Sequence, residues 1–186
     1  MTEDRCNELM DQIIRLEWDM FSRVRTLEPA ECQERGGTFR VMRRMHHSVM
    51  PEAVLESYLD DLRQANIRGR NLMTEKYARM QKLMPPLSIN PLIPKIVDIE
   101  AEWMRDLADR FPATFQSAIL NFVNYASCEL ETYSDRTLFL YHDMVVEARR
   151  QDRNLAEERY SYLFRKMGYD SIAEREEKHK ADPAVE

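Results

Sequence analysis

The sequence predicts an all-α protein, folded as a single-domain bundle of five to seven helices. The chain has 186 residues and only four glycines, which is too few for the many tight hairpin turns of a β-sheet protein. It is rich in Met, Leu, Glu, Arg and Ala, whose side chains lose little rotamer freedom in a helix. Its apolar residues also recur at steps of three and four, the period of an amphipathic helix. A chain of this length can bury one substantial core, and we expect residues 1–170 to form the helical domain and residues 171–186 a charged, flexible tail.

The first half of the chain is expected to hold three or four helices. Residues 3–26 carry apolar side chains at helical spacing. Thr38 is a candidate N-cap for a short second helix that ends before Pro51, and Pro51 suits the first turn of a third. Gly69 interrupts a pattern that resumes at Leu72. Because one glycine costs a helix only about 1 kcal/mol, the sequence is compatible with one long helix or with two shorter ones.

A proline-rich connector at about 85–94 separates these helices from the second half of the chain. Four of the eight prolines lie in the segment PPLSINPLIP, so it cannot be a regular helix. Its Leu and Ile side chains indicate an ordered connector, since a flexible linker between domains would be polar. Beyond it we expect a helix over 94–110, one long helix over 112–148, and a last packed helix over 153–167 that Gly168 ends.

Composition excludes several classes of function. The net charge of −6 repels phosphate backbones, which disfavours a nucleic-acid partner. The three cysteines have no CxxC spacing, so neither a zinc site nor a disulfide framework is predicted. The N-terminus is acidic, and no apolar run approaches the roughly 20 residues of a membrane span. We therefore expect a cytoplasmic protein with reduced thiols and no membrane partner.

Charged residues on apolar helix faces are the main functional signal in the sequence. Glu17 shows it best, because its helical neighbours are Ile13, Ile14, Met20 and Phe21. A lone buried charge costs several kcal/mol unless it is paired, so several such residues are expected to gather in one polar cluster. Six charged residues lie on or beside apolar stripes: Glu17, Arg43, Arg70, Lys76, Glu129 and Glu131.

This cluster predicts an enzyme or a binding protein for a small anionic or zwitterionic, amino-acid-like ligand, with the reaction class left open. Arginine grips a carboxylate through two parallel hydrogen bonds, so Arg43 and Arg70 are candidate anchors for the ligand. Glu17, Glu129, Tyr133 and Lys76 are candidates for moving protons or binding an amine. The neighbouring polar residues Asn71, Glu131 and Ser134 are further candidate ligand contacts.

No metal or cofactor is predicted. His46 and His47 are adjacent, and adjacent residues on a helix project about 100° apart, which does not suit a shared metal. Di-iron helical bundles need Glu-x-x-His on two helices, and the sequence does not carry that motif twice. The glycine-rich loop of phosphate sites is missing from the sequence.

An interaction protein or accessory subunit is the alternative function. The chain has twelve methionines, whose flexible side chains suit an adaptable surface for a protein partner. In that case the charged residues form a purely structural salt-bridge network. Homodimerisation through helix packing is compatible with both hypotheses.

Several motifs together resemble an uncharacterised bacterial family known only as a domain of unknown function. The resemblance covers most of residues 13–170 and implies no activity. It marks Trp18, Gln33 and Tyr77 as further site positions beside those already chosen by burial. The motifs are EWDMF, TFRVMRRMH, GRNLMTEKYARM and ELETYSDRTLFLY.

Overall fold

The computed structural model describes residues 2–24 and 36–181, and this part of the chain contains ten helices and no strand. The predicted all-α class is therefore confirmed, whereas the predicted count of five to seven helices is too low. None of these helices combines the length and the apolar character that crossing a membrane requires. The helices are α1 (Thr2–Phe21), α2 (Gly36–His47), α3 (Glu52–Ile67), α4 (Leu72–Met80), α5 (Leu92–Arg110), α6 (Pro112–Phe115), α7 (Ile119–Leu130), α8 (Asp135–Arg150), α9 (Leu155–Lys166) and α10 (Ile172–Ala181).

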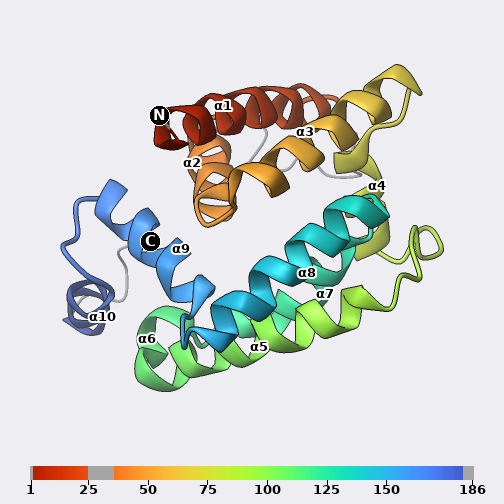
Figure 1. Cartoon of the computed structure of the whole chain (residues 1–186). Coiled ribbons are helices and arrows are strands. Elements are labelled where there is room, and N and C mark those ends of the chain that lie inside the picture. The colour runs from red at the N-terminus through yellow and green to blue at the C-terminus, as the bar shows by residue number, and fades with distance from the viewer. Residues whose placement is uncertain (1, 25–35, 182–186) are drawn as a thin grey trace.

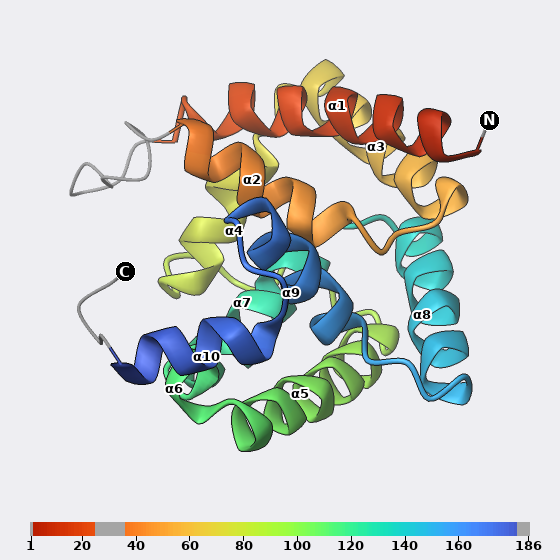
Figure 2. The same cartoon turned by 90° about the vertical axis from the view of Figure 1, so that its left-hand side faces the viewer.

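The helices form two layers, joined by α4 at one end and by α2 and α9 at the other (Figure 1). α1 packs along α3 in one layer, and α5 packs against α7 and α8 in the other. α3 contacts α8 across the layers, and α4 contacts both α1 and α7. A view turned by 90° shows α2 and α9 side by side, facing the space between the layers (Figure 2). The two layers therefore enclose one shared interior.

The apolar stripes of the helices meet in this interior. Several side chains from both layers expose none of their surface to water, namely Ile13, Leu55, Leu62, Ile96, Leu107, Leu138 and Val145. Burying a side chain of this kind contributes about 1.5–3 kcal/mol to folding. Charged groups that enter the same space must therefore be paired with one another.

The region expected to form one long helix, residues 112–148, is divided into α6, α7 and α8. Ser134 is the N-cap of α8, because its Oγ accepts a hydrogen bond from the backbone N–H of Thr137 at 3.2 Å. The backbone N–H of Ser134 donates to Asp61 Oδ2 at 3.0 Å. The predicted long helix is wrong because this cap redirects the chain while the apolar residues keep their helical spacing across the turn.

Gly69 separates two helices, which decides between the two arrangements left open by the sequence. α3 ends at Ile67, α4 begins at Leu72, and Gly69 has a φ of +68°. The predicted end of α9 at Gly168 is confirmed, with a φ of +90° at that residue. Both glycines adopt a left-handed conformation that other residues rarely take.

The proline-rich connector, expected at about 85–94, runs from α4 to the start of α5 at Leu92. The end of α7 holds it in place. The Glu131 carboxylate accepts two hydrogen bonds from Arg79, at 2.7 and 2.9 Å, and one from the backbone N–H of Leu87 at 3.0 Å. Glu131 therefore fixes the connector against α4 and α7.

The charged segment after residue 171 forms α10, which packs against α6 and α9. Glu176 is only 2% exposed. Its carboxylate accepts hydrogen bonds from the backbone N–H groups of Ala113 and Thr114 at 3.1 and 2.8 Å, and from the Thr114 hydroxyl at 2.7 Å. α10 thus supplies the acceptor for the first N–H groups of α6, and residues 172–181 belong to the packed fold.

Replacing Glu176 by alanine is expected to lower the free energy of unfolding by about 0.5–2 kcal/mol, since it removes the acceptor that caps the first N–H groups of α6. Urea denaturation followed by circular dichroism measures the change. Glu177→Ala is the matched control, because the Glu177 side chain is 75% exposed and pairs with Lys180 in solvent. Equal stability of the two variants would show that α10 does not cap α6.

Candidate functional site

Arg43 connects three helices at the centre of the interior. It lies on α2 and is 4% exposed. Its Nε and Nη2 donate to the two carboxylate oxygens of Glu17 on α1, at 2.9 and 2.5 Å. Nη2 also donates to Oε1 of Glu129 on α7 at 2.6 Å. One guanidinium therefore holds two carboxylates that lie 112 positions apart in the chain, which confirms that charged residues from distant segments form a buried polar cluster.

Glu17 is fully buried and fully hydrogen-bonded. Besides Arg43, it accepts hydrogen bonds from Tyr58 Oη at 2.9 Å and from His47 Nε2 at 3.1 Å. His47 must be the donor, because a carboxylate only accepts. Burial by itself would raise the pKa of Glu17, but the attraction of Arg43 and His47 outweighs it and lowers that pKa to about 2. Glu17 therefore stays ionised inside the protein.

Glu129 forms the second half of this cluster. Its Oε2 accepts a hydrogen bond from Lys76 Nζ at 2.6 Å, and Lys76 Nζ also donates to Tyr125 Oη at 3.2 Å. Burial opposes ionisation of Glu129, yet Arg43 and Lys76 hold its pKa well below the usual range. Lys76 is 2% exposed, and the charge of Glu129 outweighs its burial and raises the pKa of its ammonium. We call Glu17, Arg43, Lys76 and Glu129 the central network.

His46 lies beside the central network on the side facing α9. Arg43, His46 and His47 share one face of α2, since they are spaced as i, i+3 and i+4. His46 Nε2 is hydrogen-bonded to Tyr133 Oη at 3.3 Å and lies 3.9 Å from Glu129 Oε1. Burial, followed by the charge of Arg43, lowers the pKa of His46 well below its usual range. His46 is therefore a neutral imidazole at pH 7.

A second buried network lies on the other side of His46 and consists of Glu100, Tyr141 and Arg159, from α5, α8 and α9. Arg159 Nη1 donates to Glu100 Oε1 at 3.0 Å, and Nη2 donates to Tyr141 Oη at 2.6 Å. Tyr141 Oη donates to the same Glu100 oxygen at 2.8 Å. Arg159 Nε is buried and has no hydrogen-bond partner among the described residues.

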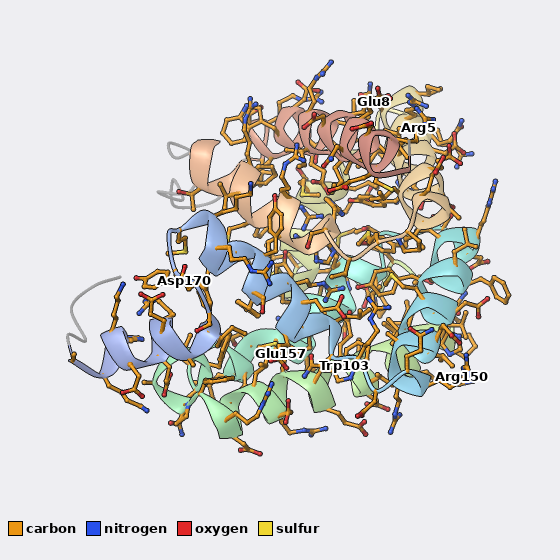
Figure 3. The ribbon with its side chains drawn as sticks, turned by 60° about the vertical axis from the view of Figure 1, so that its left-hand side comes forward. Arg5, Glu8, Trp103, Arg150, Glu157 and Asp170 are labelled. Carbon is orange, nitrogen blue, oxygen red and sulfur yellow. The ribbon has the colours of Figure 1, made fainter. Side chains whose placement is uncertain are left out.

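Contacts at its N-terminal end fix the position of α9. Asn154 caps the helix, accepting a hydrogen bond from the Glu157 backbone N–H at 3.0 Å, and its amide donates to the backbone oxygen of Trp103 on α5 at 3.2 Å. Figure 3 shows Glu157 and Trp103 where α9 meets α5. The first turns of α9, which carry Arg159, are therefore fixed against α5.

Two cavities lie between the networks. The inner cavity has a volume of about 310 Å³, and Arg43, His46, Tyr125 and Arg159 contribute its polar lining with Asn121. The small cavity, of about 40 Å³, lies deeper, between the second network and Glu129. Apolar side chains supply the rest of the inner lining: Met42, Met45, Met80, Met104, Ala118, Phe122, Ala156 and Tyr160.

The structure brings five of the twelve predicted site residues into the buried cluster and leaves six outside it, and the twelfth, Gln33, lies outside the described residues. Four of the five form the central network, and the fifth is Tyr133, which contacts His46 and is 4% exposed. The expected burial of Arg70 is wrong, because its side chain is 44% exposed and pairs with Glu75 at 2.6 Å. Asn71 caps α4 by accepting from the Thr74 N–H, and its amide donates to the backbone oxygen of Met20 at 2.8 Å.

The remaining predicted residues, apart from Gln33, make packing, capping or connector contacts. Trp18 packs against Phe39 with ring centroids 5.4 Å apart, and the Tyr77 ring lies 5.2 Å from Lys76 Nζ. Ser134 caps α8, and Glu131 holds the connector, as described above. Gln33 lies outside the described residues. The functional roles assigned to these residues remain predictions.

Sequence reasoning missed the second network entirely, although a signal was present. The helical neighbours of Glu100 at minus four, minus three, plus three and plus four are Ile96, Val97, Trp103 and Met104. This is the same pattern that identified Glu17. Applied to α9, the same test finds apolar residues on both sides of Arg159. His46, His47 and Tyr58 carried no comparable signal, because a histidine or tyrosine on an apolar face is an ordinary core residue.

Comparison with known proteins gives a family and no activity. Residues 7–177 match the family described as "Protein of unknown function (DUF4125)". A search of curated proteins finds no match to the chain. A search of solved structures finds none either. The family match spans both networks and both cavities, so the function has to be argued from the site.

Proposed function

This chain belongs to the family described as "Protein of unknown function (DUF4125)", and we propose from its own site that it binds a small monocarboxylate with an apolar body. The inner cavity has the character of a small-molecule site. Its volume of about 310 Å³ falls at the lower end of the range for ligand pockets, and most of its lining is apolar with a few convergent polar groups.

The unpartnered Nε of Arg159 is the observation that carries the proposal. A buried N–H group without an acceptor costs about 1–3 kcal/mol, and such groups are rare in native proteins unless water or a ligand completes them. Arg43 also has donor capacity left, since its Nη1 has only a long hydrogen bond of 3.4 Å to Tyr125 Oη. Two guanidinium groups that line one cavity favour a ligand with two acceptor oxygens.

The formal charges of the site favour a monoanion. Arg43, Lys76 and Arg159 balance the three carboxylates of Glu17, Glu129 and Glu100. A phosphate dianion would add two uncompensated charges to a buried region, whereas a carboxylate adds one. Neutral His46 lies against the same cavity and can take up one proton when the ligand enters.

The four candidate catalytic residues do not line the inner cavity but contact residues that do. Among the described residues, Glu17, Lys76 and Tyr133 line neither the inner nor the small cavity, and Glu129 lines only the small one. Their contacts hold Arg43 and His46 in position. The direct ligand contacts in this proposal are Arg43, His46, Tyr125 and Arg159, of which only Arg43 was among the site residues predicted from the sequence.

The methionines favour a cavity lining over a surface for a protein partner. Met45, Met50 and Met73 are buried, with exposed fractions of 8%, 4% and 1%. Met42 and Met80 line the inner cavity. Because methionine side chains are flexible and polarisable, they can adapt to the apolar body of a ligand.

Calorimetric titration with octanoate tests the proposal. Arg159→Lys is the informative variant, because lysine keeps the positive charge beside Glu100 and removes the Nε donor. A lost hydrogen bond to a charged group is expected to weaken octanoate binding by roughly tenfold to a hundredfold. Arg165→Lys, at an exposed position of the same helix, is the matched control and should bind as the wild type does. If the wild type does not bind octanoate, or if both variants bind it equally, the proposal is wrong.

A further inference from the structure

A third and larger hollow adjoins the inner cavity. This outer groove has a volume of about 630 Å³ and lies between α2, α6, α9 and α10. Its apolar lining residues are Val41, Met42, Phe115, Ala118, Tyr160, Leu163, Phe164 and Met167.

The outer groove and the inner cavity are arranged end to end along the same two helices. Both are lined by Met42, Ala118 and Tyr160. Along α9, Ala156 and Arg159 line only the inner cavity, whereas Leu163 and Met167 line only the groove. At 1.5 Å per helical residue, the path from Arg159 to Met167 spans about 12 Å. The two hollows therefore adjoin along these helices, with the charged end inside, and we call them together the channel.

The same order holds on α2, which runs in the opposite sense along the channel. His46 lines the inner cavity, Met42 lines both hollows, and Thr38 lines only the outer groove. α2 and α9 contact each other and lie side by side in Figure 2. An extended molecule in the channel would contact residues of both helices.

The outer groove presents mainly apolar surface. Val41, Met42 and Met167 are 40%, 41% and 54% exposed, which leaves large apolar side chains in contact with water. The hydroxyl of Thr114 is already bonded to Glu176 at 2.7 Å. Arg175 and His179 of α10 also line the groove. At the opposite, inner end of the channel, Arg159 is 6% exposed and its Nε has no hydrogen-bond partner among the described residues.

We infer that the ligand is an amphiphilic monocarboxylate with an unbranched alkyl tail, whose carboxylate is held by Arg159 and Arg43 and whose tail lies along the outer groove. This inference rests on the proposed function and specifies its ligand class. The exposed apolar side chains of the groove would be covered by the tail. The length of the channel favours a medium-length chain over a short carboxylic acid.

A series of unbranched carboxylates tests whether the alkyl tail contributes to binding. Butanoate, hexanoate and octanoate are titrated into the wild-type protein by calorimetry, below the concentrations at which they form micelles. Each methylene buried from water tightens binding by about fourfold, the equivalent of about 0.8 kcal/mol. Octanoate is therefore expected to bind more than about fiftyfold tighter than butanoate.

A blocking variant tests the position of the tail. Val41→Trp places a large ring in the groove and is expected to weaken octanoate binding at least about tenfold while leaving butanoate binding unchanged. Val146→Trp is the matched control, since Val146 is 41% exposed and lies on α8, which lines neither the groove nor the inner cavity. It should leave both affinities unchanged.

The outcomes separate this inference from the proposed function. If butanoate and octanoate bind equally well and Arg159→Lys weakens both, the inferred position of the tail is wrong. The proposed carboxylate site would then still stand. Octanoate binding that Arg159→Lys does not change would overturn the proposed orientation, because the carboxylate would then lie elsewhere. If none of the three acids binds, the proposed function fails and the inference fails with it.

Discussion

Arg43→Gln is expected to lower the free energy of unfolding by on the order of 5 kcal/mol, a large part of the stability of a domain of this size. The substitution removes the cation between Glu17 and Glu129, which are 0% and 2% exposed. Lys76 still pairs with Glu129, but Glu17 retains only His47 and Tyr58 as hydrogen-bond donors. A buried carboxylate without a cation is the most costly defect that one substitution can create here.

The neighbouring arginine provides a matched control. Arg44 lies on the same helix, and its side chain is 28% exposed and pairs with Asp11 at the surface. Because exposed ion pairs contribute only about 0–1 kcal/mol, Arg44→Gln should unfold close to the wild-type urea concentration. Urea denaturation at pH 7 compares the two variants. Similar losses for Arg43→Gln and Arg44→Gln would show that the central network does not hold the layers together.

The expected loss for Arg43→Gln should shrink as the pH falls. In that variant Glu17 loses the largest of the charges that lower its pKa, so its pKa rises from about 2. Protonation then removes the buried charge at a mildly acidic pH. A smaller stability difference from the wild type at pH 5 than at pH 7 would confirm that the defect is electrostatic and not a packing fault.

Helical periodicity in the sequence was sufficient to predict which charged residues are buried wherever the helix was continuous. Glu17 and Lys76 lie within helices whose apolar neighbours appear at the expected steps, and both are buried. The prediction failed at Arg70, because Arg70 lies on an apolar helix face only if the helix continues through Gly69. The left-handed glycine ends the helix, so Arg70 lies in the turn and its side chain faces solvent.

The partners of these charges were harder to predict than their burial. Pairing depends on how the helices cross, and the crossings depend on turns such as the one that Ser134 caps. The periodic pattern is the same on both sides of that turn. Nothing in the spacing of apolar residues indicates that α8 changes direction and carries Tyr141 to Glu100. The pairing within the second network therefore becomes apparent only in the folded structure.

The cavity itself could not be predicted from the sequence. A methionine on an apolar helix face has the same pattern whether it fills a core or lines a hollow. Met104 is 1% exposed and Met42 is 41% exposed, yet both line the inner cavity. Packing between α2, α7 and α9 decides where space remains, and that packing involves residues more than 100 positions apart.

Acidification is expected to destabilise the wild-type protein by more than about 3 kcal/mol between pH 5 and pH 2. The pKa of Glu17 falls from 4.5 to about 2 on folding, which corresponds to about 3 kcal/mol, and the pKa of Glu129 is lowered as well. Unfolding at low pH therefore takes up protons. The stabilisation is fully present above about pH 4.5 and is lost as the pH falls toward the folded-state pKa values.

Two variants, Glu17→Gln and Glu147→Gln, show whether a carboxylate with a lowered pKa makes the fold acid-sensitive only when it is buried. Glu17→Gln should be less stable at pH 7, but the slope of its stability against pH below 4.5 should decrease by up to one proton. Glu147 is the control, because Arg150 and Gln151 also lower its pKa to about 2 while its side chain is 48% exposed. Solvent screens that pair, so Glu147→Gln should leave the acid-unfolding midpoint unchanged. Urea denaturation at several pH values between 2 and 5 measures both slopes, and an unchanged slope for Glu17→Gln would mean that Glu17 is not the buried carboxylate that makes the fold acid-sensitive.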